Sequence, residues 1–245
     1  MFNFLRKPKK HIELPLLVDI HSHLLPGLDD GVKSVQETIY ILKILKKLGY
    51  KKIITTPHIM SDHYPNSRLD IISKLEYVKD VIKKQGIDIQ LEAAAEYYLD
   101  ENFISRLTHQ KKFLTFGNNY LLFETSFFNK PAFLEEAVFN MNAQGYQPIL
   151  AHPERYGYLQ QDDKLLEKLR NMNLMFQMNM LSLTGFYSIE VKKFALKLLK
   201  ANLIHFVGTD CHNALQANEI LNKMNSKNVK LISSHNILNR NLMAL

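Results

Sequence analysis

Short apolar runs alternate along the chain with longer segments in which apolar residues recur at helical spacing. Runs bounded by turn signals predict seven strands, at residues 15–21, 51–58, 89–97, 119–125, 147–152, 174–179 and 204–210. The helical spacing predicts helices between them, at residues 34–49, 67–86, 100–110, 130–145, 163–173 and 188–202. Such alternation is typical of an α/β fold with a parallel sheet, either open or closed into a barrel.

Residues that favour helix starts and stops mark several of these boundaries. Gly49, Gly86 and Gly145 stand where three helices should end, and Ser34 with Glu37 predicts a capping box at the start of the first. The 245 residues contain no internal repeat and no Pro, Ser or Gly linker that would divide them. We therefore predict one domain over residues 16–245, preceded by a flexible basic arm over residues 1–15.

Residues of the types that bind metal ions stand at the ends of six of the seven predicted strands. In chain order they are His21 and His23, His58, Glu96, Glu124, His152, and Asp210 with His212. The carboxyl ends of parallel strands meet at one face of the sheet, where ligands bind. The pattern predicts that residues nearly 200 positions apart share one pocket, joined by Asp30 from the loop after the first strand.

Taken singly, each of these residues has an ordinary explanation, such as a hydrogen-bonded core histidine or a surface ion pair. Eight at equivalent positions are hard to assign to chance, because burying so many ionisable groups without cations is costly. Imidazole and carboxylate without thiolate suit Mn²⁺, Fe²⁺, Zn²⁺ or Mg²⁺. Their number predicts two or three ions, with Glu96 and Asp210 as candidate bridges. Clustered divalent ions are typical of phosphoester hydrolysis, in which they orient the phosphate and activate water.

Polar side chains near the strand ends are candidates for binding a phosphorylated substrate. Arg155 stands three residues after the predicted strand that ends at position 152, and its guanidinium could hold phosphate oxygens as a fork. A surface salt bridge would also explain it. His63 and Arg68 lie on a predicted loop after position 58, where they could contact substrate or simply face solvent. Asn179 is a further candidate for lining the same pocket.

Charge and cysteine content limit the partners and the cellular compartment that we expect for the protein. The formal net charge of +7 suits an anionic partner, whether a phosphorylated substrate, nucleic acid or a lipid surface. Cys211 is the sole cysteine, so no internal disulfide can form and a cytoplasmic location is expected. We find no secretory signal or membrane span. The basic arm could touch an anionic membrane, which would make the protein membrane-proximal, or it could be merely solvated.

The motifs that carry these residues resemble those of the PHP (polymerase and histidinol phosphatase) metallohydrolases. They are "DIHSH" with His21 and His23, "DDG" with Asp30, "TPH" with His58, "AAEYY" with Glu96, "FET" with Glu124, "AHPERY" with His152 and Arg155, and "GTDCH" with Asp210 and His212. The resemblance implies a distorted seven-stranded (β/α)7 barrel of TIM-like form, the PHP fold. It also implies a three-metal centre held by the nine His, Asp and Glu residues.

Among PHP proteins the chain most closely resembles the bacterial tyrosine phosphatases of capsule and exopolysaccharide clusters, the CpsB/YwqE type, over roughly residues 16–212. The resemblance implies Mn²⁺-favoured hydrolysis of phosphotyrosine on a bacterial tyrosine kinase that controls polysaccharide export. Arg155 would bind the phosphate, and His58 is a candidate general acid. Cys211 departs from the small residue usual before the last histidine, and its thiol could add sensitivity to oxidation.

Other functions remain open at this point. The same centre could serve a small-molecule phosphatase of the histidinol phosphatase kind. A PHP exonuclease agrees with the net charge, although no RNA-binding signature or basic groove with interleaved aromatic residues is present. A non-catalytic module that binds a kinase or export complex would be expected to have lost ligands. A cysteine-dependent phosphatase is excluded, because the residue six positions after Cys211 is Ala217 rather than arginine.

Overall fold

The structure is a computed structural model that describes residues 13–244. Its strands are β1 (Val18–Asp19), β2 (Lys52–Thr55), β3 (His58–Ile59), β4 (Gln90–Ala93), β5 (Glu96–Tyr98), β6 (Tyr120–Glu124), β7 (Gln147–Ala151), β8 (Met175–Asn179) and β9 (Phe206–Gly208). Its helices are α1 (Val35–Lys47), α2 (Arg68–Lys84), α3 (Glu101–Thr108), α4 (Leu134–Ala143), α5 (Gly157–Gln160), α6 (Asp163–Asn171), α7 (Ile189–Lys200), α8 (Ala214–Lys223) and α9 (Ser226–Ser233). Three 3₁₀ helices complete the description: η1 (Pro153–Arg155), η2 (Met180–Thr184) and η3 (Leu238–Ala244).

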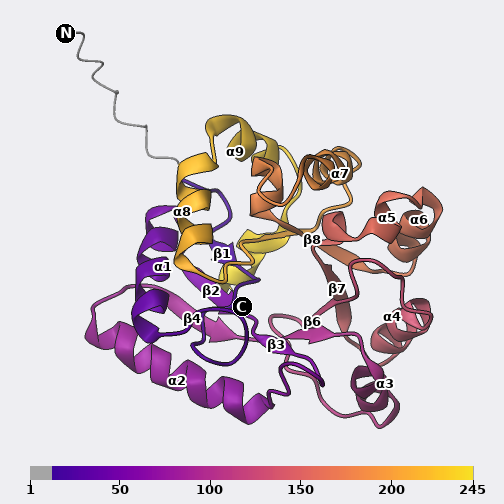
Figure 1. The fold of residues 1–245 in the computed structure, drawn as a ribbon, viewed down its shortest axis with the longest axis horizontal. Helices are drawn as coiled ribbons and strands as arrows, with labels where there is room; N and C mark the ends of the chain where they lie inside the picture. Colours follow the sequence, from indigo (N-terminus) through magenta and orange to yellow (C-terminus); the bar gives the residue numbers. More distant parts are fainter. Residues whose placement is uncertain (1–12, 245) are drawn as a thin grey trace.

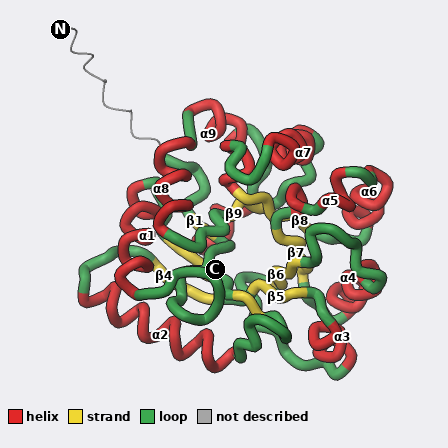
Figure 2. The backbone as a smooth tube through the Cα atoms, in the orientation of Figure 1, coloured by secondary structure: helices red, strands yellow, loops and turns green. Residues whose placement is uncertain are grey.

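The strands lie inside a ring of helices (Figures 1 and 2) and pair in parallel throughout. They form a three-stranded sheet of order β1-β2-β4 and a six-stranded sheet of order β3-β5-β6-β7-β8-β9. The predicted α/β fold with parallel strands is therefore confirmed. The ladders among residues 13–244 form these two sheets, whereas a single closed seven-stranded barrel was predicted.

Two of the predicted strands change sheet midway. β2 and β3 both fall in the predicted strand 51–58, and β4 and β5 both arise from the predicted strand 89–97. The first break falls at Pro57, which has no N–H to donate to a ladder. The second falls beside it, where Ala94 N–H donates to Thr55 O at 2.9 Å and Glu96 N–H to Pro57 O at 3.2 Å. Each of the seven predicted stretches contains at least one strand, and two of them contain two, which gives nine strands within residues 13–244.

The start of α1 follows the prediction only in part. The Ser34 hydroxyl accepts a hydrogen bond from Glu37 N–H at 3.3 Å, as an N-cap should. The return bond of a capping box is absent. The Glu37 carboxylate instead accepts from Lys33 N–H at 3.3 Å and from Ala214 N–H at 3.0 Å. Glu37 therefore ties α1 to the start of α8, a contact between segments far apart in sequence.

The region after residue 212 contains elements that the sequence did not predict. Within α8 only Ala217 and Ile220 are buried, and within α9 only Ile232. In η3 the buried Asn239 amide donates to Val18 O at 2.8 Å and to Val207 O at 2.7 Å. This side chain joins the backbones of β1 and β9, whose following loops carry several of the candidate site residues.

Most of the predicted N-terminal arm, residues 1–12, lies outside the described residues. Leu14, which was assigned to that arm, is buried, and its N–H donates to Leu48 O at 2.8 Å. Packed structure therefore begins before residue 16. In the described part of the chain no helix combines the length and apolar character needed to span a bilayer.

Candidate metal centre

The strand ends bring all nine predicted His, Asp and Glu residues into one cluster. They form four overlapping groups, and in each group one side-chain atom from every member lies within 4.8 Å of the others. The groups are His23, Asp30, His58 and His212; His21, His23 and Glu96; His21, His152 and Asp210; and His58, Glu96 and Glu124. Over residues 13–244 these groups include no tenth residue.

Glu96 lies at the middle of the cluster and is fully buried. Its Oε2 is 3.0 Å from His21 Nε2 and 3.3 Å from His23 Nε2, and its Oε1 is 3.1 Å from His152 Nε2. Burial by itself would raise the pKa of Glu96, but the imidazoles of His21 and His58 hold that pKa well below its usual range. The central carboxylate is therefore ionised, and each of its oxygens faces imidazole nitrogen.

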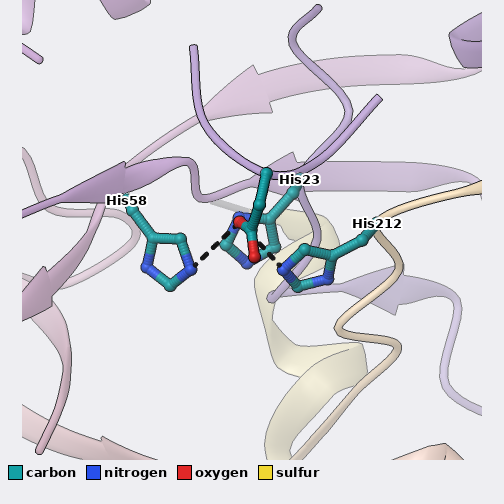
Figure 3. Close-up of side chains that lie close together, drawn as sticks. His23, His58 and His212 are labelled. Atoms are coloured by element: carbon teal, nitrogen blue, oxygen red, sulfur yellow. Dashed lines mark ion pairs between the residues drawn. The ribbon is translucent and has the colours of Figure 1, made fainter. Parts of the chain in front are cut away.

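Asp30 lies at the open edge of the cluster, with about half of its side chain (54%) exposed. Its Oδ1 is 3.6 Å from His58 Nε2 and 3.5 Å from His212 Nε2. Figure 3 shows these two imidazoles directed at the shared carboxylate, with His23 beside them. The ring centres of His23 and His212 are 3.9 Å apart in a stacked arrangement. This group is therefore the part of the cluster nearest to solvent.

Glu124 and Asp210 add two further carboxylates. Glu124 Oε1 is 3.3 Å from His58 Nδ1, and Asp210 Oδ1 is 3.3 Å from His21 Nε2. Burial raises the pKa of Glu124 well above its usual range, and the charges of Glu96 and Asp210 raise it further. Carboxylates that repel one another in a buried site favour bound positive charge.

A chain of hydrogen bonds that begins at Asp210 decides which ring nitrogen carries the proton in neutral His21. Because the ionised Asp210 carboxylate can only accept, the amide that meets its Oδ2 must be Asn179 Nδ2, at 2.5 Å. Asn179 Oδ1 then accepts from Gln177 Nε2 at 2.9 Å, which leaves Gln177 Oε1 at 2.7 Å from His21 Nδ1. Neutral His21 therefore carries its proton on Nδ1 and directs the Nε2 lone pair into the cluster.

His23 is oriented in the same way by Asp29. Asp29 Oδ2 lies 2.7 Å from His23 Nδ1 and also accepts from His58 N–H at 2.9 Å. The Nε2 atoms of His21 and His23 are 3.3 Å apart, so in their neutral forms two lone pairs face each other and a carboxylate. A cation satisfies such an arrangement. These imidazole and carboxylate side chains therefore fit a centre for divalent ions.

Burial keeps two of the histidines in the form that binds metals. It lowers the pKa of His58 to about 4 and also lowers the pKa of His152. Both imidazoles are therefore neutral near pH 7. For His21 burial acts in the same direction, but Glu96 and then Asp210 outweigh it and raise the pKa to about 8. For His23 the charge of Asp29, together with hydrogen bonds to Asp210 and Glu96, also outweighs burial and raises the pKa well above its usual range.

Two cluster residues have left-handed backbone conformations, with φ of 33° at His152 and 49° at Asp210. Such conformations cost roughly 1–3 kcal/mol each for residues other than glycine and gather at functional sites. No pattern in the sequence predicts these left-handed conformations. Gln177 was also missed, although its position two residues before Asn179 places both amides on the same side of β8.

A cavity of about 560 Å³ opens beside the cluster. Seven of the nine cluster residues line it, together with Arg155 and the aromatic residues Tyr64, Tyr98, Phe127, Phe128 and Tyr187. Arg155 Nη1 donates to Asp210 Oδ2 at 3.3 Å, so the predicted phosphate-binding side chain lies at the cluster. The other two predicted substrate residues, His63 and Arg68, are exposed and do not line this cavity.

Cys211 lies within the cluster's backbone but points away from it. The residue is fully buried, and its thiol donates to Asn213 O at 3.4 Å. Burial raises the pKa of the Cys211 thiol far above its usual range. A buried thiol that stays protonated reacts slowly with oxidants, so this geometry does not support the expected sensitivity to oxidation.

Comparison with solved structures finds chains of similar fold. One match is a crystal structure from work that describes YwqE of Bacillus subtilis and CpsB of Streptococcus pneumoniae as unique metal-dependent tyrosine phosphatases. It has a TM-score of 0.77 and 26% identity to this chain. The match covers 93% of this chain and 94% of that one. A phosphotriesterase homology protein of Escherichia coli, at 12% identity and a TM-score of 0.53, shares the fold alone.

Sequence comparison gives the same relatives. The tyrosine-protein phosphatase YwqE of Bacillus subtilis is 29% identical over 202 residues, which cover 82% of this chain and 80% of YwqE. The tyrosine-protein phosphatase CpsB of Streptococcus pneumoniae is 27% identical over 80% of this chain and 83% of CpsB. The family model "Capsular polysaccharide synthesis, CpsB/CapC" matches residues 17–239. The chain therefore belongs to the CpsB/CapC family of capsular polysaccharide synthesis proteins.

Proposed function

We propose that this protein is a metal-dependent protein-tyrosine phosphatase that hydrolyses phosphotyrosine in protein substrates. The observation that carries the proposal is the convergence of nine imidazole and carboxylate side chains beside Arg155 in one aromatic-lined cavity. The activity named for the relatives YwqE and CpsB supports it.

The donor set supports two or three divalent ions, and we propose Mn²⁺ as the favoured one, with Fe²⁺, Zn²⁺ or Mg²⁺ as alternatives. The residues that would hold them are the four groups of the cluster, in which Glu96 is shared by two groups. Bound ions would supply Lewis acidity toward the phosphate and lower the pKa of water.

The chain's own residues would bind and orient the substrate. Arg155, whose side chain is 26% exposed, would hold non-bridging phosphate oxygens through the edge of its guanidinium that Asp210 leaves free. The aromatic wall, including Tyr98 and Phe128, would surround the substrate's ring and exclude water. A phenolate leaves readily, so little proton donation is needed. If an acid acts on the leaving oxygen, His58, which lines the cavity as well as belonging to the cluster, is the candidate.

We further propose that the physiological substrate is a bacterial tyrosine kinase that regulates polysaccharide export. The description of the family as capsular polysaccharide synthesis proteins supports this. Such a kinase would place the protein in the cytoplasm close to the membrane, where a basic N-terminal arm and a net charge of +7 would suit an anionic surface.

We also propose that residues 16–245 form one domain whose two sheets are the parts of one distorted seven-stranded barrel. Two contacts between the first and last strands support closure: an isolated parallel bridge between Ser22 and Cys211, and the Asn239 amide that bonds to both Val18 and Val207. The circular arrangement of strands in Figure 2 agrees with this.

A comparison of substrates tests the proposed function. With Mn²⁺ present, kcat/KM for a phosphotyrosyl peptide is expected to exceed that for histidinol phosphate by at least about 10-fold, because the aromatic wall contacts an aryl ring. Equal or faster hydrolysis of histidinol phosphate would instead identify a small-molecule phosphatase. Degradation of a single-stranded oligonucleotide in preference to both would identify an exonuclease.

A further inference from the structure

The Arg155 guanidinium contacts two aromatic rings. Its Cζ is 4.4 Å from the centre of the Phe127 ring and 4.5 Å from the centre of the Tyr187 ring. Phe127 comes from the loop after β6, and Tyr187 from the segment between η2 and α7. Both distances are within the range of favourable cation–π contact. Segments 60 positions apart in the sequence thus contact the same guanidinium.

The two rings are themselves fixed to the scaffold. Phe127 stacks on Tyr156, with ring centres 5.7 Å apart, and its backbone O accepts from Gly157 N–H at 2.9 Å. The Tyr187 hydroxyl accepts from Asn179 Nδ2 at 3.2 Å, and Asn179 also donates to Asp210. The same network that sets the tautomer of His21 therefore also steadies one of these rings.

Two ring contacts and the hydrogen bond to Asp210 together restrict the orientation of the guanidinium. A free arginine side chain has about 2 kcal/mol of rotamer entropy to lose when it binds a ligand. If the side chain is already ordered, that cost is not incurred on binding, and phosphate binds more tightly. Stacking on aromatic rings also leaves the in-plane N–H groups of the guanidinium free to donate to phosphate oxygens.

We propose that Phe127 and Tyr187 are positioning residues: they form an aromatic clamp that presents Arg155 to the phosphate group and thereby sets the affinity for it. This inference rests on the proposed function, in which Arg155 binds phosphate. The clamp acts on the phosphate group itself, so it affects inorganic phosphate as well as phosphotyrosine.

A different role would give a different result. Both rings line the cavity, so they would also be available to contact the substrate's aromatic ring directly. Direct contact would leave the affinity for inorganic phosphate unaffected, because that ion has no ring, and it would persist when Arg155 is replaced. A double-mutant cycle with Arg155 therefore separates the two roles.

The test uses the Mn²⁺-loaded full-length protein and the variants Phe127→Leu, Tyr187→Leu and Tyr187→Phe, with the two leucine variants also made in an Arg155→Ala background. Inhibition by inorganic phosphate gives Ki, and a phosphotyrosyl peptide gives KM and kcat separately. Each leucine variant is expected to raise Ki and KM by about 3- to 10-fold, because one of the two cation–π contacts with Arg155 is lost. Tyr187→Phe keeps the ring but loses the hydrogen bond from Asn179, so it is expected to raise Ki and KM by less than Tyr187→Leu does.

In the Arg155→Ala background the leucine substitutions are expected to have no further effect on Ki. Tyr77→Leu, at a half-exposed tyrosine on α2, is the matched control for loss of an aromatic ring. Bound Mn²⁺ and melting temperature identify any variant that has lost its fold. In that case Phe127→Met, whose longer unbranched side chain adapts better to the space of the ring, replaces Phe127→Leu. The clamp is refuted by an unchanged Ki, or by equal changes in both backgrounds. If Arg155→Ala itself leaves Ki unchanged, the phosphate-binding role in the proposed function fails as well.

Discussion

Glu96→Gln is expected to lower kcat/KM for a phosphotyrosyl peptide by about 10³-fold, and to lower the content of bound Mn²⁺. Glu96 places its two oxygens 3.0 Å from His21 Nε2 and 3.1 Å from His152 Nε2, at the point where the groups of the cluster meet. A glutamine of the same size replaces one oxygen with an amino group, which cannot act as a metal ligand, and removes the negative charge. Steady-state kinetics and metal analysis of the purified variant measure both effects.

Glu76→Gln is the matched control, because Glu76 lies on α2 and pairs with Lys79 at the surface. It is expected to leave turnover and metal content unchanged. A Glu96→Gln protein that keeps both parental turnover and parental metal content would show that the cluster is not the catalytic centre.

Arg155→Ala is expected to lower kcat/KM by about 10²- to 10³-fold while metal content stays at the parental level. Removing the guanidinium deletes the cationic group that faces the cavity beside Asp210, but Asp210 keeps its bond from Asn179. Arg155→Lys is expected to recover only part of the activity, since an ammonium cannot form the bidentate fork.

The control for Arg155→Ala is Arg170→Ala, at an exposed arginine on α6. Its kinetics are expected to match those of the parent. If Arg155→Ala had the same KM and the same Ki for inorganic phosphate as the parent, Arg155 would have no part in binding the phosphate group.

The candidate cluster was predictable because it depends on a rule of topology. Parallel strands end on one face, so a polar residue after each apolar run identifies a shared site without any knowledge of loop structure. Asp30 was predicted from its motif, and it lies beside His58 and His212. The same rule fails for loops, whose paths depend on their own contacts, and this is why His63 stays outside the cavity. Arg68 begins α2 and faces solvent.

Features that depend on long-range contacts had no clear signal in the sequence. Pro57 is a signal for a break in the predicted strand, but which sheet each half joins depends on the strands beside it. Gln177 looks like an ordinary strand residue until Asn179 and His21 are seen on either side of it. The clamp around Arg155 needs two loops to meet, and nothing local in either loop indicates the other.

The central claim is that phosphotyrosine hydrolysis depends on metal ions held by this cluster. The most direct measurement is turnover of a phosphotyrosyl peptide by protein stripped of metal with a chelator and then titrated with Mn²⁺, in parallel with Glu96→Gln. The parent protein is expected to lose nearly all turnover when stripped and to regain it as about two or three equivalents of Mn²⁺ bind, whereas Glu96→Gln stays inactive. Full turnover by protein shown to be free of metal would contradict the claim.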